Sequence, residues 1–160
     1  MKIGIISDTH LSTPSEALFR LMQGLFANVS MVLHAGDLTG LDVLDAFSGK
    51  ELISVHGNMD QTDVVQKLPK ERIVDVKGYQ IALTHGWGYP GNIEKRLKEH
   101  FGAVDAIVYG HTHRPANHEK DGVLFFNPGA FSGSYPMKRN RSVGLLTVDE
   151  HGISGEIIKL

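Results

Sequence analysis

The chain has 160 residues, of which 41% are hydrophobic and 21% charged, as in an ordinary globular domain. This length predicts one domain over residues 1–160. A formal net charge of -2 gives no reason to expect specific nucleic-acid binding, and the lack of cysteine excludes disulfides and thiolate metal sites. Because neither a signal peptide nor a membrane-length apolar run is visible, we expect a cytoplasmic protein without membrane contact.

The first half of the chain alternates strand-like and helix-like segments. Residues 2–7, 31–33 and 52–55 are short apolar runs, typical of buried strands. Apolar residues spaced for one helical face predict a helix over residues 14–28, capped by Ser12 or Thr13, and a shorter helical segment over residues 41–47. This order predicts right-handed crossovers and a parallel sheet.

Hairpins dominate the second half. Residues 72–77 and 79–84 flank Gly78, residues 92–101 have the pattern of an amphipathic helix, and residues 106–109 form another buried run. Asp121-Gly122 is a turn signal before a strand at 123–126, and His151-Gly152 separates strands at 142–148 and 153–159. The whole pattern predicts an α/β fold, a four-layer α/β/β/α sandwich of two mixed β-sheets flanked by helices.

Five of the strand-like runs end in a small cluster of Asp, His or Asn. The clusters are Asp8-Thr9-His10, Gly36-Asp37, Gly57-Asn58, His85-Gly86 and His111-Thr112-His113. Taken singly, each is explained equally well by a loop cap, a turn or a structural histidine. Ligands in open α/β sheets bind beyond the carboxyl ends of strands, so the joint set predicts a metal site there.

The number of candidate ligands indicates two ions. The candidates are Asp8, His10, Asp37, Asn58, His85, His111 and His113, too many for a single catalytic ion that keeps an open position. Asp37 is able to bridge two cations, and two cations roughly 3.5–4 Å apart are the arrangement that cleaves phosphate esters. We expect two divalent ions per chain, with Mn preferred and Ni, Fe, Zn or Mg as alternatives.

These ordered motifs, with Asp60 and the FNPGA stretch at residues 126–130, resemble the calcineurin-like metallophosphoesterases, most of all their small bacterial and archaeal phosphodiesterase branch. The resemblance covers residues 2 to about 129. It implies one ion bound by Asp8, His10, Asp37 and His113, and a second bound by Asp37, Asn58, His85 and His111. It also implies hydrolysis of small phosphate diesters by a metal-activated water, with Asn58 and His85 in contact with the substrate.

One position departs from the family pattern. Most of the superfamily has a histidine after Gly-Asn, proposed to protonate the leaving group, where this chain has Met59. Methionine has no proton to donate. No side-chain general acid is therefore assigned, and good leaving groups are favoured. His34 and His56 are left as either replacements for this acid or structural residues.

Several weaker candidates have two readings. Asn127 either binds a phosphate oxygen or belongs to a plain turn, and the loop with Trp87 and Tyr89 is either a lid or ordinary packing. Lys138, Arg139 and Arg141 either attract an anionic substrate or form a solvated loop. The alternative functions are a phosphomonoesterase or phosphoprotein phosphatase, and a non-catalytic scaffold like the retromer subunit of this fold. A homodimer is compatible with the sequence.

Overall fold

Two five-stranded mixed sheets pack face to face in the computed structural model, which describes residues 1–133 and 139–160. The first sheet has the order β10-β9-β1-β2-β3, with β1 Lys2–Ile6, β2 Met31–His34, β3 Glu51–Ser54, β9 Ser142–Asp149 and β10 Gly152–Lys159. The second has the order β4-β5-β6-β8-β7, with β4 Glu71–Val76, β5 Tyr79–Thr84, β6 Ala106–Val108, β7 Ala116–Lys120 and β8 Val123–Asn127. The predicted fold class is confirmed.

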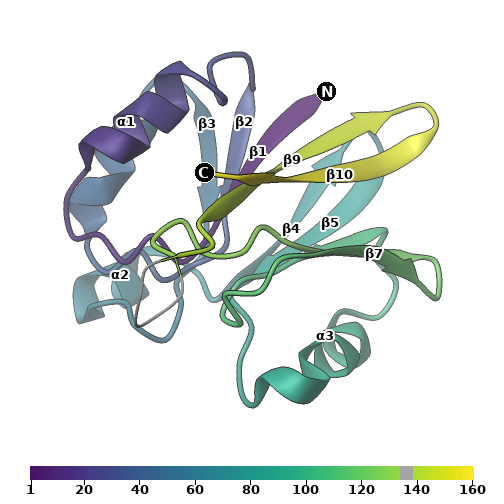
Figure 1. Cartoon of the computed structure of the whole chain (residues 1–160). Coiled ribbons are helices and arrows are strands. Elements are labelled where there is room, and N and C mark those ends of the chain that lie inside the picture. The colour runs from purple at the N-terminus through teal and green to yellow at the C-terminus, as the bar shows by residue number, and fades with distance from the viewer. Residues whose placement is uncertain (134–138) are drawn as a thin grey trace.

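Helices cover the outer faces of both sheets (Figure 1). They are α1 Glu16–Gln23, η1 Leu41–Phe47, α2 Thr62–Lys67, η2 Pro90–Asn92 and α3 Ile93–Phe101. α1 and η1 pack on the first sheet around Phe26 and Phe47, and α3 packs on the second around Leu97. The apolar residues between the two sheets form the central core. Within the described residues, no helix is long and apolar enough to cross a membrane.

Parallel pairs occupy the centre of each sheet. β1 pairs in parallel with β2, and β2 with β3, while β5, β6 and β8 are parallel neighbours in the second sheet. Antiparallel strands complete the first sheet on its β9–β10 side, opposite the parallel edge strand β3, and complete the second sheet at both edges. The carboxyl ends of the parallel strands therefore lie at one end of the sandwich, where the polar clusters follow them.

Some helix boundaries differ from the prediction. The helix expected over residues 14–28 is shorter, because Ser15 caps it by accepting the Leu18 N–H at 3.2 Å and the helix ends at Gly24. Ser12 and Thr13 are not its cap. The following turn still buries Phe26 and Val29, which explains the misleading apolar periodicity. α2 was not predicted, since six residues with only Val64 buried give little periodic signal.

Candidate metal centre

The loops that follow the parallel strands hold the candidate ligands in an uncommon backbone conformation. Five of the seven have a positive φ, between 48° and 68°: Asp8, His10, Asp37, His111 and His113. Residues other than glycine adopt this region rarely, at some cost in free energy, and such strain concentrates at functional sites. Lys77 and Asp121 adopt the same region in turns elsewhere, but five strained residues gather at this edge of the sandwich.

Asp8 is at the centre of the first group of ligands. Its side chain is fully buried, and Oδ2 accepts a hydrogen bond from Ser7 Oγ at 2.5 Å. Among the described residues, Oδ1 has no hydrogen-bond partner, although His113 Nε2 lies 3.1 Å away and His10 Nε2 lies 4.0 Å away. A buried carboxylate oxygen surrounded by imidazole nitrogens in this way has the geometry of a metal ligand.

The first group is completed by two histidines from distant parts of the chain. His10 Nε2 and His113 Nε2 are 3.3 Å apart, and their rings lie with centroids 5.3 Å apart. One ligand atom from each of Asp8, His10 and His113 falls within 4.8 Å of the others. The structure thus brings together residues that are 103 positions apart in sequence.

A second group joins Asp8, Asp37 and His85, again with ligand atoms within 4.8 Å of one another. Asp37 Oδ2 lies 3.3 Å from His85 Nε2 and 4.0 Å from His10 Nε2. Asp8 Oδ1 likewise lies 4.0 Å from His85 Nε2. Both carboxylates are therefore close to histidines of both groups, and both have the position of a bridging ligand.

Backbone carbonyls orient two of the histidines. His85 Nδ1 is 2.8 Å from the Ala35 carbonyl and His111 Nε2 is 2.9 Å from the Gly88 carbonyl. Because a carbonyl only accepts, each of these nitrogens donates, and in the neutral ring the other nitrogen keeps its lone pair.

The lone pairs of these two histidines converge on Asn58. Its Oδ1 is 3.2 Å from His85 Nε2 and 2.9 Å from His111 Nδ1. Three acceptor atoms directed at one another repel, and a cation between them is the natural partner. The donor set therefore fits a divalent metal ion.

The charges at the site perturb three pKa values. Burial opposes protonation of His85, but the Asp37 carboxylate, 3.3 Å from Nε2, and the charge of Asp8 together raise its pKa. Burial likewise works against ionisation of Asp37, yet His85 and the Met59 N–H hold the pKa of Asp37 below its usual value. The Asp8 carboxylate, 3.1 Å from His113 Nε2, raises the pKa of His113 against the effect of burial. Protons and metal ions thus compete for these imidazoles.

Two glycines leave the room that the carboxylates need. A Cβ on Gly57 would overlap Asp37 Oδ1, and a Cβ on Gly110 would meet Ser7 Oγ and lie 2.8 Å from Asp8 Oδ2. The glycines in the Gly57-Asn58 and Gly110-His111 pairs therefore allow backbone to approach the carboxylates closely.

Asp60 has a role that sequence reasoning missed. Its carboxylate accepts three backbone N–H groups, from Gly57 at 2.6 Å and Asp37 at 3.1 Å on Oδ2, and from Thr39 at 2.6 Å on Oδ1. It thereby joins the loop that carries Asp37 to the loop that carries Asn58. The sequence signal for this role is an acidic residue two positions after Asn58.

The two histidines left open by the sequence lie beside the site. His34 is fully buried, its Nδ1 accepts the Gly36 N–H at 3.2 Å, and its Nε2 lies 3.3 Å from Thr9 Oγ1. Burial lowers the pKa of His34 to about 4, so the ring is neutral at physiological pH and supports the loops. His56 is partly buried, with Nδ1 3.4 Å from the Gly57 carbonyl. Neither lines the open cleft formed by the described residues.

Asn127 is buried and directed into the protein. Its Nδ2 donates to the Gly110 carbonyl at 2.8 Å and to Thr112 Oγ1 at 3.1 Å, while its Oδ1 accepts the Gly129 N–H at 2.8 Å. These contacts hold the segment that carries His111. The structure does not place Asn127 among the residues that line the cleft.

The loop after His85 is mostly packed against α3. Arg96 donates to the carbonyls of Trp87 and Tyr89 at 2.7 and 2.6 Å, and the Trp87 ring meets His100 edge-on at 5.2 Å. Tyr89 itself is 80% exposed. These contacts favour the packing interpretation for Trp87.

An open cleft of about 800 Å³ lies over the ligand groups. Five of the seven candidate ligands line it: His10, Asp37, Asn58, His111 and His113. Met59 lies at the rim of the cleft and is 59% exposed. Arg141, which follows all seven candidate ligands in the sequence, also lines the cleft. Of the basic run, Lys138 lies outside the described residues and Arg139 is exposed.

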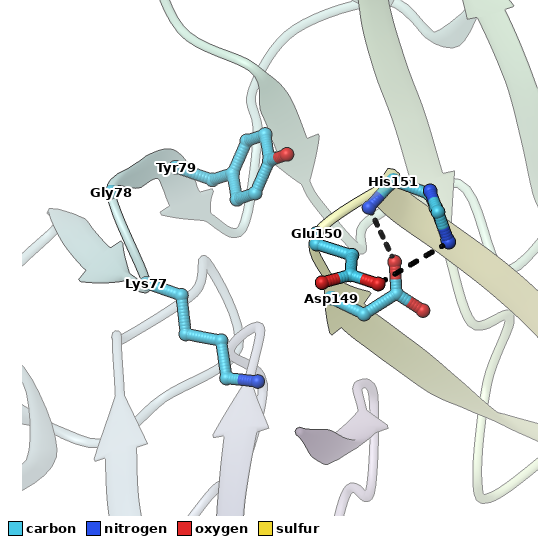
Figure 2. A pocket seen from close by; sticks show the side chains of 6 residues that line it. All are labelled: Lys77, Gly78, Tyr79, Asp149, Glu150 and His151. Atoms are coloured by element: carbon cyan, nitrogen blue, oxygen red, sulfur yellow. Dashed lines mark hydrogen bonds and ion pairs between the residues drawn. The ribbon is translucent and has the colours of Figure 1, made fainter.

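Another cleft, at the opposite end of the sandwich, has a different character (Figure 2). It lies between the β4–β5 and β9–β10 turns and is lined by Lys77, Tyr79, Asp149, Glu150 and His151, among others. His151 Nε2 lies 3.7 Å from Glu150, and both side chains are more than 80% exposed. Pairs of exposed charges at the tips of turns are weak. The stronger candidate for a functional site is therefore the cluster of metal-ligand candidates beyond the strand ends.

Comparison with known proteins agrees with this geometry. Residues 1–151 match the model of the calcineurin-like phosphoesterase superfamily domain. The chain belongs to this superfamily. A probable metallophosphoesterase from Methanothermobacter thermautotrophicus is 32% identical over 163 residues, which cover 99% of this chain and 92% of the relative.

Solved structures of similar proteins include an archaeal phosphodiesterase and Vps29. An archaeal phosphodiesterase is 28% identical, covers 99% of this chain and 100% of its own, and superposes with a TM-score of 0.76. Vps29 from Entamoeba histolytica, solved with zinc, is 23% identical, with 99% of each chain covered and a TM-score of 0.74. At that identity the likeness to Vps29 shows the fold alone. As a calcineurin-like phosphoesterase, the chain is expected to use divalent metal ions, and the two ligand groups are candidates to hold them.

Proposed function

We propose that this chain is a metal-dependent phosphodiesterase that holds two divalent ions between its two ligand groups. The observation that carries the proposal is that the two groups share Asp8, with the ligand atoms of each group within 4.8 Å of one another. Asp37 of the second group also lies 4.0 Å from His10 of the first. Such a pair of ions, when bound, supplies an activated water and neutralises charge on the phosphoryl group.

The chain's own residues divide between the two ions. His10 and His113, with Asp8 and Asp37 beside them, would hold the first. Asn58, His85 and His111 would hold the second, and the distances to His85 from Asp37 and Asn58 support this division. Asp37 as the shared ligand follows the family pattern, and Asp8 is a member of both groups.

The backbone prepares these ligands before any ion or substrate binds. The Ala35 and Gly88 carbonyls fix the tautomers of His85 and His111, so that their free nitrogens face Asn58. Buried Asp8 and Asp37 are held by Ser7 and by the Met59 N–H respectively. Ordered ligands lose little entropy on binding, which favours a stable site.

Diesters with good leaving groups are the proposed substrates, and the cleft has an apolar side chain where a proton donor would stand. Met59 is exposed at the cleft and has no proton to give to a leaving alkoxide. Substrates with good leaving groups need no such acid. The name of the archaeal relative supports the same class. Manganese is the proposed metal, since imidazole, carboxylate and amide ligands together suit it.

The test is hydrolysis by protein that is stripped of metal and reloaded with Mn²⁺. We expect faster turnover of bis(p-nitrophenyl) phosphate than of p-nitrophenyl phosphate, and loss of both on metal removal. His85→Ala should lower activity by at least about 100-fold, because it removes a ligand. His151→Ala, at an exposed turn, is the matched control and should leave activity unchanged. No metal-dependent turnover of either ester would refute the proposal, and preference for the monoester would refute the substrate class.

A further inference from the structure

The cleft extends well beyond the ligand groups. Its volume of about 800 Å³ is in the range of pockets that hold whole small molecules, whereas a phosphoryl group fills only a small part of it. Leu11, Ala17, Met59 and Phe131 give the rest of the cleft apolar walls. This part of the cleft has room for the organic substituent of an ester.

Arg141 introduces a fixed positive charge into these apolar walls. Its Nε donates to the Phe131 carbonyl at 2.8 Å, and its guanidinium lies over the Phe131 ring at 4.9 Å from the centroid. Phe131 is only 3% exposed, so the ring is a firm support. The Arg141 backbone is also held, since its carbonyl accepts the Leu160 N–H at 2.9 Å and residue 141 bridges Ala130.

An arginine held in this way is suited to an anionic ligand. The guanidinium has five N–H donors in one plane, and the hydrogen bond from Nε to the Phe131 carbonyl uses one of them. Because the side chain is already ordered, binding an anion costs little further rotamer entropy. Low-polarity walls also strengthen a charge-assisted hydrogen bond relative to one in water.

We propose that Arg141, supported by Phe131, is a specificity-determining residue that binds a second anionic group on the substrate. The favoured substrates are then phosphate diesters with a substituent of about nucleoside size, apolar in its body, that carries a further phosphate or carboxylate. This inference rests on the proposed function, because the scissile phosphate is bound at the adjacent ligand groups.

The direct test is a binding measurement with two related probes on the Mn²⁺-loaded chain. Thymidine 3′,5′-bisphosphate and thymidine 5′-monophosphate differ by one phosphate, so the ratio of their dissociation constants reports the extra anionic contact. We expect the bisphosphate to bind about tenfold more tightly, the usual scale of one charge-assisted contact. Arg141→Gln should reduce this ratio to near one. Isothermal titration calorimetry measures both constants.

Matched variants separate this contact from general effects. Arg139→Gln removes the same charge from an exposed neighbour and should leave the ratio at the wild-type value. Ala17→Glu places a carboxylate in the cleft from an exposed position on α1 and should also lower the ratio, independently of any effect of Arg141 on folding. Arg141→Lys should restore part of it. A wild-type ratio near one, an unchanged ratio in Arg141→Gln, or an equal loss in Arg139→Gln would overturn the inference.

Turnover distinguishes failure of this inference from failure of the proposed function. The KM values of thymidine 5′-(p-nitrophenyl phosphate) and its 3′-phosphorylated form should differ in the same sense as the binding constants, and Arg141→Gln should remove the difference in KM. If neither ester is hydrolysed with Mn²⁺, the proposed function fails while the binding ratio still tests Arg141. If both are hydrolysed with equal KM, the function stands and the role of Arg141 is refuted.

Discussion

Asp60 Oδ2 accepts the backbone N–H of Asp37 at 3.1 Å, which ties a metal-ligand candidate to the loop of another cluster. The same carboxylate also accepts the N–H groups of Gly57 and Thr39. In the sequence, this acid is one of the residues that carry the family resemblance, and no structural role is assigned to it. In the structure it positions the carboxylate and amide ligands relative to each other.

The first prediction concerns this positioning. Asp60→Asn keeps one acceptor oxygen but loses the second, so at least one of three partly buried N–H groups is left without its partner. We expect a loss of stability of about 1–3 kcal/mol and weaker metal binding. Chemical denaturation and metal titration measure the two effects. Asp45→Asn, on the outer helical segment η1, is the control; an equal effect there, or no effect at Asp60, would contradict a positioning role.

The second prediction concerns Met59. Met59→His restores a proton donor at an exposed position on the cleft rim, where packing constraints are weak. Activity toward bis(p-nitrophenyl) phosphate should stay within a few-fold of wild type, and activity toward an alkyl diester should rise, by up to about 100-fold. Steady-state kinetics on both esters provide the comparison. A large loss on the aryl ester would mean that the Met59 side chain contributes contacts other than those described.

The third prediction concerns the number of ions. His10→Ala removes a ligand of the first proposed ion, and His111→Ala removes a ligand of the second. If the loss of one ion does not release the other, each variant should retain one ion per chain, whereas wild type holds two. Elemental analysis after gel filtration counts them. His118→Ala, outside both groups, should retain both, and a wild-type content of one ion would refute the dinuclear site.

The fourth prediction concerns acid stability. Burial lowers the pKa of His34 from 6.5 to about 4. Below pH 6.5, His34 therefore binds a proton in the unfolded chain but stays neutral in the folded chain. Stability should therefore fall between these two pH values, by up to about 3 kcal/mol at the lower one. The effect of His34 is absent above 6.5, where both states are neutral at this residue.

Urea unfolding of metal-free protein between pH 7.5 and 4.5 measures this contribution as a difference between wild type and His34→Gln. The raised pKa values of His85 and His113 act in the opposite sense, because their stabilisation is lost as pH rises, and both variants share that effect. Stability of His34→Gln should fall less steeply toward acid. If the free energy of unfolding changed equally with pH in wild type and His34→Gln, His34 would be protonated in the folded chain as it is in the unfolded chain.

The strands and their end clusters were accessible from sequence because each is a local signal. Short β-branched runs such as residues 2–6 are distinct from loops, and an Asp or His directly after them is visible by eye. Helix ends were less accessible, since the buried Phe26 extends the apolar periodicity beyond the end of α1 at Gly24. β7 is an edge strand with mostly exposed polar residues and has little periodic signal.

The amino-acid sequence by itself determined the type of candidate site: seven candidate oxygen and nitrogen ligands, no thiolate, and a methionine where a proton donor is usual. Tertiary structure alone decided which ligands meet, because His10 and His113 become neighbours only when two sheets pack with their strand ends aligned. It also decided that Asp60 and Asn127 hold loops, and that Arg141 stacks on Phe131 within the cleft. Side-chain roles of this kind depend on contacts between segments far apart in the chain, and local patterns do not encode them.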